Sequence, residues 1–310
     1  MTVLLLLGSA VALAVAAPAW LLRAGWTNRA PRLGVLAWHT AAATLVVCVI
    51  AAAQIMIMPW HQADDAICMV WRLCLDALVG AHGRAAQVMA WTGAAVLLAV
   101  TIRIAVAGVQ LARAAARRRR HTALVRLIGH HRADIGATVV DHPDSAVYLI
   151  PGRSREVVVT TGAISRLDRE ELAAVLAHER AHARGRHHLS LMVAVLLCRA
   201  FPAAVFRHAE RQIHRLVELC ADEQACRHHS RLVLARALVA LATPASPPGM
   251  LAAAGGDALE RVHRLMRPPA PLPRRVTAIA TAMLLTLPLL PLALVVAIPA
   301  VPALRAGLPL

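Results

Sequence analysis

The sequence predicts an α-helical membrane protein with an α+β domain inserted between its third and fourth transmembrane helices. Apolar residues make up 59% of the 310 residues and the mean hydropathy is +0.60, values too high for an ordinary soluble protein. Four stretches of the chain are apolar for about 20 residues each. The long segment between the third and the fourth instead combines strand patterns with amphipathic helix patterns, which predicts a folded domain there.

The four apolar stretches cover residues 2–22, 35–58, 86–110 and 276–300. Each has the ~20 residues that cross a ~30 Å hydrocarbon core at 1.5 Å per residue. The first has no positive residue before it, so it predicts a retained anchor rather than a cleaved signal peptide. The resulting domain boundaries are 1–110 for three transmembrane helices, 111–275 for the inserted domain, and 276–310 for the fourth helix with a short external tail.

Arginines predict how these helices are oriented. They follow the first span, follow the third span and precede the fourth: Arg23, Arg29, Arg32, Arg113, Arg117 to Arg120, Arg267, Arg274 and Arg275. By the positive-inside rule these ends are cytoplasmic, whereas the loop 59–85, with its three aspartates, lies outside. The sequence therefore predicts a multi-pass protein of the plasma membrane whose inserted domain is cytoplasmic and lies next to the lipid bilayer.

Charge and cysteine content argue against two other classes of protein. The formal net charge is +16, but aromatic residues make up only 3% and the arginines cluster beside apolar runs, so direct nucleic-acid binding is not expected. The six cysteines form neither a disulfide framework nor a C-x-x-C metal motif. Cys68 and Cys74 can pair only if their loop faces an oxidising compartment, and two free thiols are the alternative.

The inserted domain begins with a strand region and continues with helices. Residues 137–140 and 156–161 have the composition of short strands and are separated by a turn-rich stretch. Asp168 followed by Glu171 predicts a capping box, and the apolar face of that helix continues to about Gly185. Further helices are expected at 189–200, 203–229, 231–243 and 257–267.

The capped helix carries the motif His178-Glu179-Arg180-Ala181-His182. Histidines four apart project from one helix face, where both can reach one zinc ion at about 2.0–2.1 Å. Glu179 is then placed as the general base that activates metal-bound water and passes the proton to a leaving amine. The alternative, a solvated face in a chain with 16 histidines, is disfavoured because the motif lies on a capped helix directly after a strand.

A catalytic zinc needs a third protein ligand, and two candidates compete for this role. His188 continues the motif with a metzincin spacing, but it requires a helix break at Gly185, after which the apolar pattern predicts a continuing helix. Glu218 has a supporting carboxylate, Asp222, one turn on, which can accept a hydrogen bond from the far ring nitrogen of His178. We therefore favour Glu218, for which the alternative is a surface carboxylate paired with an arginine of its own helix.

Residues 189–206 are apolar enough to suggest a fifth crossing of the membrane. A single crossing would separate Glu218 from His178, and Arg199 and Pro202 also interrupt the stretch. We expect a buried or membrane-skimming helix that holds the site close to the bilayer. An extended peptide is expected to pair with the free edge of the preceding strand and pass over the zinc.

These residues resemble the BlaR/MecR family of integral-membrane zinc metallopeptidases. The resemblance rests on Val157 to Gly162, on Ala174 to His182, on Glu218 to Asp222, on Glu260 to Leu265, and on the order of the spans. It implies a gluzincin-like zinc peptidase domain with three metal ligands, His178, His182 and Glu218. Glu179 falls on the family's catalytic position.

The resemblance also implies a function. It suggests a zinc endopeptidase that cleaves a cytoplasmic protein, a winged-helix repressor of the BlaI type or the chain itself, in signal-responsive regulation. The family's sensors carry a penicillin-binding domain after the fourth span, and only residues 301–310 follow it here, so direct sensing of β-lactams is not expected. The alternatives are a quality-control metalloprotease similar to the HtpX family and a non-catalytic membrane receptor or scaffold. The sequence leaves open whether the chain forms a homodimer.

Overall fold

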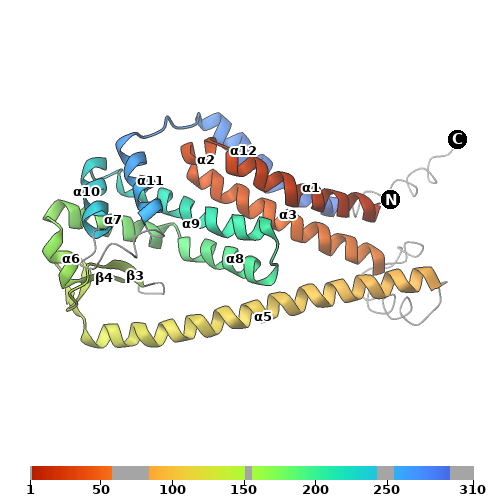
Figure 1. The fold of residues 1–310 in the computed structure, drawn as a ribbon, viewed down its shortest axis with the longest axis horizontal. Helices are drawn as coiled ribbons and strands as arrows, with labels where there is room; N and C mark the ends of the chain where they lie inside the picture. Colours follow the sequence, from red (N-terminus) through yellow and green to blue (C-terminus); the bar gives the residue numbers. More distant parts are fainter. Residues whose placement is uncertain (1, 58–83, 151–155, 243–254, 294–310) are drawn as a thin grey trace, which may run out of the picture.

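The computed structural model describes residues 2–57, 84–150, 156–242 and 255–293. This part of the chain is mostly helical, and a small sheet lies at one end of an elongated molecule (Figure 1). The loop that contains Cys68 and Cys74 and the last residues of the expected fourth span lie outside the described residues. The other four cysteines are free thiols.

Three long apolar helices, called here the membrane helices, agree with the first three expected spans. They are α1 (Thr2–Arg23), α3 (Pro31–Ile57) and α5 (Arg84–Ile128). Each contains a stretch that is long and apolar enough to cross a membrane. Helix α5 runs well beyond its apolar stretch because the alanine- and arginine-rich residues that follow are good helix formers without glycine or proline.

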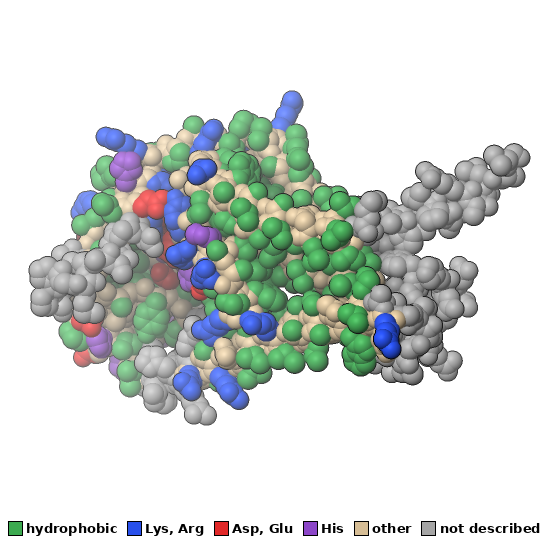
Figure 2. Space-filling view, turned by 45° about the vertical axis from the view of Figure 1, so that its right-hand side comes forward, with side chains coloured by type: hydrophobic (Ala, Val, Ile, Leu, Met, Phe, Trp, Pro, Cys, Tyr) green, Lys and Arg blue, Asp and Glu red, His purple; other side chains and the backbone are tan. Residues whose placement is uncertain are grey.

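The membrane helices are connected so that the sheet lies toward one end of them. A short helix, α2 (Trp26–Arg29), joins α1 to α3. This turn, the C-terminal end of α5 and the start of α12 (Arg274–Thr286) all lie toward the end of the molecule that holds the sheet (Figure 1). Charged and histidine side chains gather toward this end, whereas the face over the membrane helices is mostly hydrophobic (Figure 2).

The sheet has four strands in the order β1-β2-β4-β3. The strands are β1 (His130–Arg132), β2 (Ala137–Val140), β3 (Val147–Ile150) and β4 (Glu156–Thr160). β2 and β4 agree with the two expected strands. The sequence pattern does not predict β1 or β3. β1 consists only of polar, exposed residues, and β3 lies in the stretch between the two expected strands that is rich in turn-forming residues.

The expectation that the strand before the metal helix has a free edge is wrong. β4 pairs in parallel with β2 on one side and antiparallel with β3 on the other, so β3 is the edge strand on that side. The valine run Val157 to Val159 is fully buried, as expected for a central strand covered on both faces. A peptide that adds to this sheet therefore has to pair with β3.

In the described part of the chain, six helices lie between the sheet and α12 in sequence. They are α6 (Thr161–Arg166), α7 (Arg169–Arg184), α8 (His187–Ala200), α9 (Ala204–Ala225), α10 (Arg231–Ala242) and α11 (Gly255–Met266). The predicted capping box at the start of α7 is confirmed: the Asp168 carboxylate accepts from the Glu171 N–H at 2.8 Å, and Glu171 accepts from the Asp168 N–H at 3.1 Å.

The expectation of a continuous helix after Gly185 is wrong. Helix α7 ends there, Arg186 adopts a left-handed conformation with φ of 50°, and α8 starts at His187. A Cβ atom on residue 185 would lie 2.3 Å from His187 Nε2, so glycine lets the imidazole pack against the turn. Because of this break, His187 rather than His188 lies next to the His178 to His182 motif.

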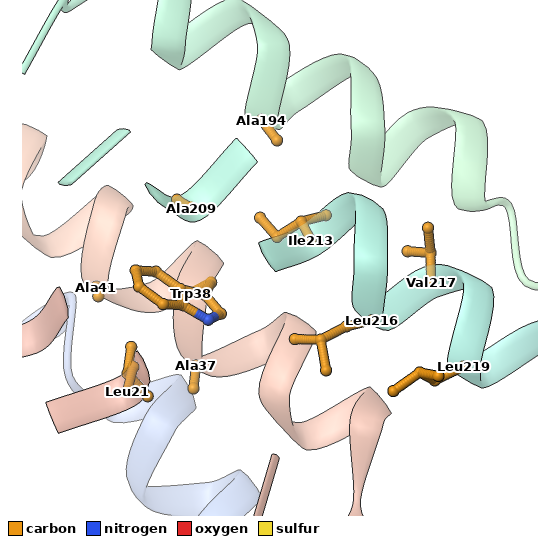
Figure 3. Packing of buried hydrophobic residues seen from close by; sticks show 10 residues of the cluster. All are labelled: Leu21, Ala37, Trp38, Ala41, Ala194, Ala209, Ile213, Leu216, Val217 and Leu219. Atoms are coloured by element: carbon orange, nitrogen blue, oxygen red, sulfur yellow. The ribbon is translucent and has the colours of Figure 1, made fainter. Parts of the chain in front are cut away.

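Helices α8 and α9 form an antiparallel pair that packs among the membrane helices (Figure 1). The chain turns back after Ala200, whose carbonyl accepts from Arg103 Nη1 of α5 at 3.1 Å. Ile213 and Leu216 of α9 lie in a buried cluster with Trp38 of α3 (Figure 3). The apolar stretch 189–206 is thus a helix and a turn within the bundle, and α9 returns to the end where α7 lies.

Candidate metal centre

Helix α7 presents the His178 to His182 motif because its other face is fixed to the sheet. Leu172, Val175 and Leu176 pack into a buried cluster with β2 and β4 residues. Arg180, within the motif, donates from Nη2 to the Ile135 carbonyl at 2.7 Å, next to the turn between β1 and β2. The motif's helix is therefore anchored along its length and its histidine side chains converge toward α9.

His178, His182 and Glu218 converge on one point. The Nε2 atoms of the two histidines are 3.1 Å apart, and each lies 3.4 Å from a carboxylate oxygen of Glu218. Tetrahedral zinc with bonds of about 2.0–2.1 Å separates its ligand atoms by about 3.3 Å. Within the part of the chain that the structure describes, these residues are the one group of three metal-ligand side chains found together. Their spacing and donor types fit a single Zn²⁺.

Asp222 lies beside the first histidine of the motif. Its Oδ1 lies 2.9 Å from His178 Nδ1, and the residue is only 1% exposed. A hydrogen bond from Nδ1–H fixes the tautomer of His178 and turns its Nε2 lone pair toward the convergent point. Glu218 and Asp222 therefore lie one turn apart on α9 and act on opposite sides of the same imidazole.

His187, rather than His188, is the additional histidine beside the motif. Its Nδ1 lies 3.0 Å from His182 Nδ1, whereas His188 is exposed. Burial, together with the neighbouring His182, lowers the pKa of His187 to about 4, so the ring is neutral at physiological pH. Sequence reasoning missed His187 because its approach depends on the break at Gly185.

Arg261 of α11 is the second site residue that sequence reasoning missed. Its guanidinium donates to both carboxylate oxygens of Asp222, from Nε at 2.9 Å and from Nη2 at 2.7 Å. Nη1 lies 3.0 Å from Glu218 Oε2. The residue comes 39 positions after Asp222, and no spacing rule within one helix connects the two.

The charges of the site are strongly coupled. Burial alone would lower the pKa of His178, but hydrogen bonds with Asp222 and Glu218 outweigh it and raise the pKa to about 9. Burial opposes ionisation of Glu218, yet the two histidines and Arg261 hold the pKa of this carboxyl well below its usual range. Without a metal, the site therefore holds a proton on His178 and a charge on Glu218.

The Glu179 carboxylate forms a hydrogen bond with the edge strand β3. Its Oε2 accepts from the Leu149 N–H of β3 at 3.0 Å. Burial raises the pKa of Glu179 above the ordinary value, which makes it a stronger base than an exposed glutamate. The candidate general base thus lies between the metal-ligand side chains and the strand that a peptide can join.

The model of peptidase family M48 matches residues 111–217. The matched segment contains the whole sheet and α7 with its motif, and it ends one residue before Glu218. No curated protein and no solved structure matches the chain. The match supports a metallopeptidase, and together with the three long apolar helices it fits a membrane-anchored enzyme of that kind.

Proposed function

We propose, with the match to a metallopeptidase family as the premise, that this chain is a multi-pass zinc endopeptidase of the plasma membrane. Its catalytic domain lies on the cytoplasmic side and cleaves a cytoplasmic protein. The observation that carries the proposal is the convergence of His178, His182 and Glu218 at ligand-to-ligand distances suited to one Zn²⁺.

Each residue of the site has a distinct role in this proposal. His178, His182 and Glu218 hold the zinc ion, while Asp222 and His187 orient the two imidazoles. Zinc, when bound, supplies Lewis-acid chemistry that lowers the pKa of water and polarises a peptide carbonyl. A set of two histidines and one glutamate leaves one position open for that purpose.

Glu179 is the general base. It removes a proton from the attacking water and returns it to the nitrogen of the departing amine, so that one carboxylate serves both steps. The Leu149 N–H holds the carboxylate in place at 3.0 Å. The raised pKa of Glu179 keeps it a competent base near neutral pH, and activity falls as the pH drops through that pKa.

The edge strand β3 is the proposed docking site for the substrate backbone. Val147 to Ile150 pair with β4 in the antiparallel register, and the Leu149 N–H donates to Glu179. A peptide that pairs with β3 therefore runs beside the general base. Because this pairing uses backbone groups and no chain end, we propose cleavage within a chain.

The position of the site favours a substrate near the bilayer. Helix α8 begins at His187, beside the motif, and packs along α5, while its apolar side chains Leu189, Met192 and Val193 are exposed. Such side chains suit contact with lipid. The resemblance to BlaR/MecR suggests a repressor of the BlaI type, or the chain itself, as the substrate of signal-responsive cleavage.

Peptide mapping tests the proposed activity. N-terminal peptides of cytoplasmic and membrane proteins are compared between cells that express the wild-type chain and cells that express Glu179→Gln, with Glu170→Gln, an exposed residue of the same helix, as the control. New N-termini are expected in wild type and in the control only. A zinc-loaded Glu179→Gln chain that retains proteolysis would refute the general-base role. Accumulation of misfolded membrane proteins alone would favour quality control over regulation.

A further inference from the structure

Arg261 contacts the supporting shell of the candidate metal centre from a separate helix. It lies on α11 and its side chain is only 15% exposed. The guanidinium binds both oxygens of Asp222 in a forked arrangement, at 2.9 and 2.7 Å. Such a planar fork fixes the plane of a carboxylate, which a single point charge does not do.

Asp222 needs this partner because it is almost completely buried. His178 Nδ1 occupies a position near Oδ1, at 2.9 Å, and leaves Oδ2 without a contact from the motif helix. Arg261 Nε satisfies Oδ2 at 2.9 Å. A buried carboxylate that loses such a partner is strongly disfavoured. The orientation of Asp222, and with it the tautomer of His178, therefore depends on Arg261.

The same guanidinium also reaches a proposed ligand. Nη1 lies 3.0 Å from Glu218 Oε2, and Nη2 lies 3.4 Å from His178 Nε2. Glu218 and Asp222 are four residues apart on α9, so Arg261 bridges two carboxylates on adjacent turns. One side chain thus contacts Glu218, Asp222 and His178.

Arg264, three residues later on α11, does not make the contacts that Arg261 makes with the site. It also pairs with an acidic residue of α9, Glu223, but it donates its other hydrogen bonds to the Asn28 carbonyl at 2.8 and 3.2 Å. No contact of Arg264 with the three convergent residues is found in the described part of the chain. The two arginines therefore join the same pair of helices, and only Arg261 touches the site.

We propose that Arg261 is a positioning residue of the metal centre: it holds Asp222 so that His178 presents Nε2, and it orients Glu218. The inference rests on the proposed zinc site but concerns the affinity for the metal rather than the reaction. Removal of an outer partner of this kind weakens metal binding by about 10- to 100-fold.

A double-mutant cycle tests this inference on the full chain in detergent, with zinc affinity measured by competition with a chelator. Arg261→Gln and Asp222→Asn are each expected to weaken Zn²⁺ binding by about 10- to 100-fold. The double variant is expected to bind zinc only slightly more weakly than the weaker single variant, because both substitutions remove the same Arg261–Asp222 interaction. Arg261→Lys, which keeps the charge without the fork, is expected to lie in between, and Arg264→Gln is expected to stay within about threefold of wild type.

The outcomes separate this inference from the proposed function. A wild-type chain that does not bind zinc at micromolar concentration contradicts the proposed function. If the wild type binds zinc and Arg261→Gln binds it with unchanged affinity, only the role of Arg261 is contradicted. The same holds if the losses of zinc affinity in the two single variants add fully in the double variant. If Arg261→Gln fails to fold by circular dichroism, Arg261→Lys decides: wild-type affinity in that variant overturns the positioning role.

Discussion

Helices α7 and α9 supply the two halves of one site, but they are supported by different surroundings. α7 carries His178 and His182 and packs on the sheet, in a core of the kind found in soluble α+β domains. α9 carries Glu218 and packs on α1 and α3, so its position depends on helices that are long and apolar enough to cross a membrane. The site is therefore held together from two sides that can be perturbed separately.

Helix α9 packs closely on the membrane-helix side of the site and forms hydrogen bonds there. A Cβ on Gly34 of α3 would lie 3.0 Å from the side chain of Leu216, so the two helices approach closely. Arg215 of α9 donates from Nη2 to Asn28 Oδ1 at 2.6 Å, and Arg32 donates to Gln224 at 3.3 Å. Helix α2 and the start of α3 thus contact α9 at positions before and after Glu218.

The largest expected effect tests whether both helices are needed for the metal. His178→Ala on α7 and Glu218→Ala on α9 are each expected to weaken zinc binding by more than the ~100-fold that outer partners cost. His188→Ala, which removes an exposed histidine, should bind zinc as wild type does. Zinc content after dialysis against a chelator measures all three. A loss confined to the His188 variant would reverse the choice of third ligand.

A smaller effect tests the supporting cores. Trp38→Ala removes a side chain that is 1% exposed against α9, and a cavity of this size costs about 3–5 kcal/mol. Leu172→Ala makes a cavity on the sheet side at about 2–5 kcal/mol. We expect Trp38→Ala to reduce zinc affinity through Glu218, and addition of zinc to restore part of its thermal stability. Unchanged affinity in Trp38→Ala would show that α9 is positioned without α3.

The pH dependence of metal binding tests how the carboxylates of α9 act on His178 of α7. In the metal-free protein the pKa of His178 is raised to about 9, mainly by Asp222 and Glu218 of α9 acting against burial. Zinc has to displace that proton, so its affinity should rise by about tenfold per pH unit and level off above about pH 9. Asp222→Asn should move the levelling to lower pH. A flat profile between pH 6 and 9 contradicts a raised pKa.

The smallest expected effect concerns α7 alone. Asp168→Ala removes the capping box and should lower the free energy of unfolding by about 1 kcal/mol. Because the cap lies at the far end of α7 from its histidines, zinc affinity should not change. Thermal unfolding and chelator competition on the same sample measure both quantities. A large loss of zinc would mean that the two ends of α7 are coupled.

Local patterns predicted much of this architecture. The capping box at Asp168 and the four-residue spacing of the histidines follow from single helices, where geometry depends on neighbouring residues. Glu218 and Asp222 could be connected to His178 because the metal chemistry demands a ligand and a supporting acceptor at helical spacing. The structure brings these residues together, with Glu218 3.4 Å and Asp222 2.9 Å from ring nitrogens of His178.

Features that depend on packing between distant segments were not predictable in this way. β3 is a strand because β4 offers it a partner, although its surroundings are rich in turn residues. The break at Gly185 follows from the close packing of His187, which apolar periodicity does not record. Arg261 reaches Asp222 only once α10 and α11 have folded against α7 and α9.

The packing of α9 against α3 has a consequence for biogenesis. The sheet and α7 can pack with each other through residues that follow one another in the sequence, whereas Glu218 reaches its place only beside Trp38 and Leu21, which belong to α3 and α1. A chain that has not inserted these helices would present two histidines without their carboxylate. Under the proposed function, insertion of α1 and α3 into the membrane would therefore act as a maturation step that completes the metal centre.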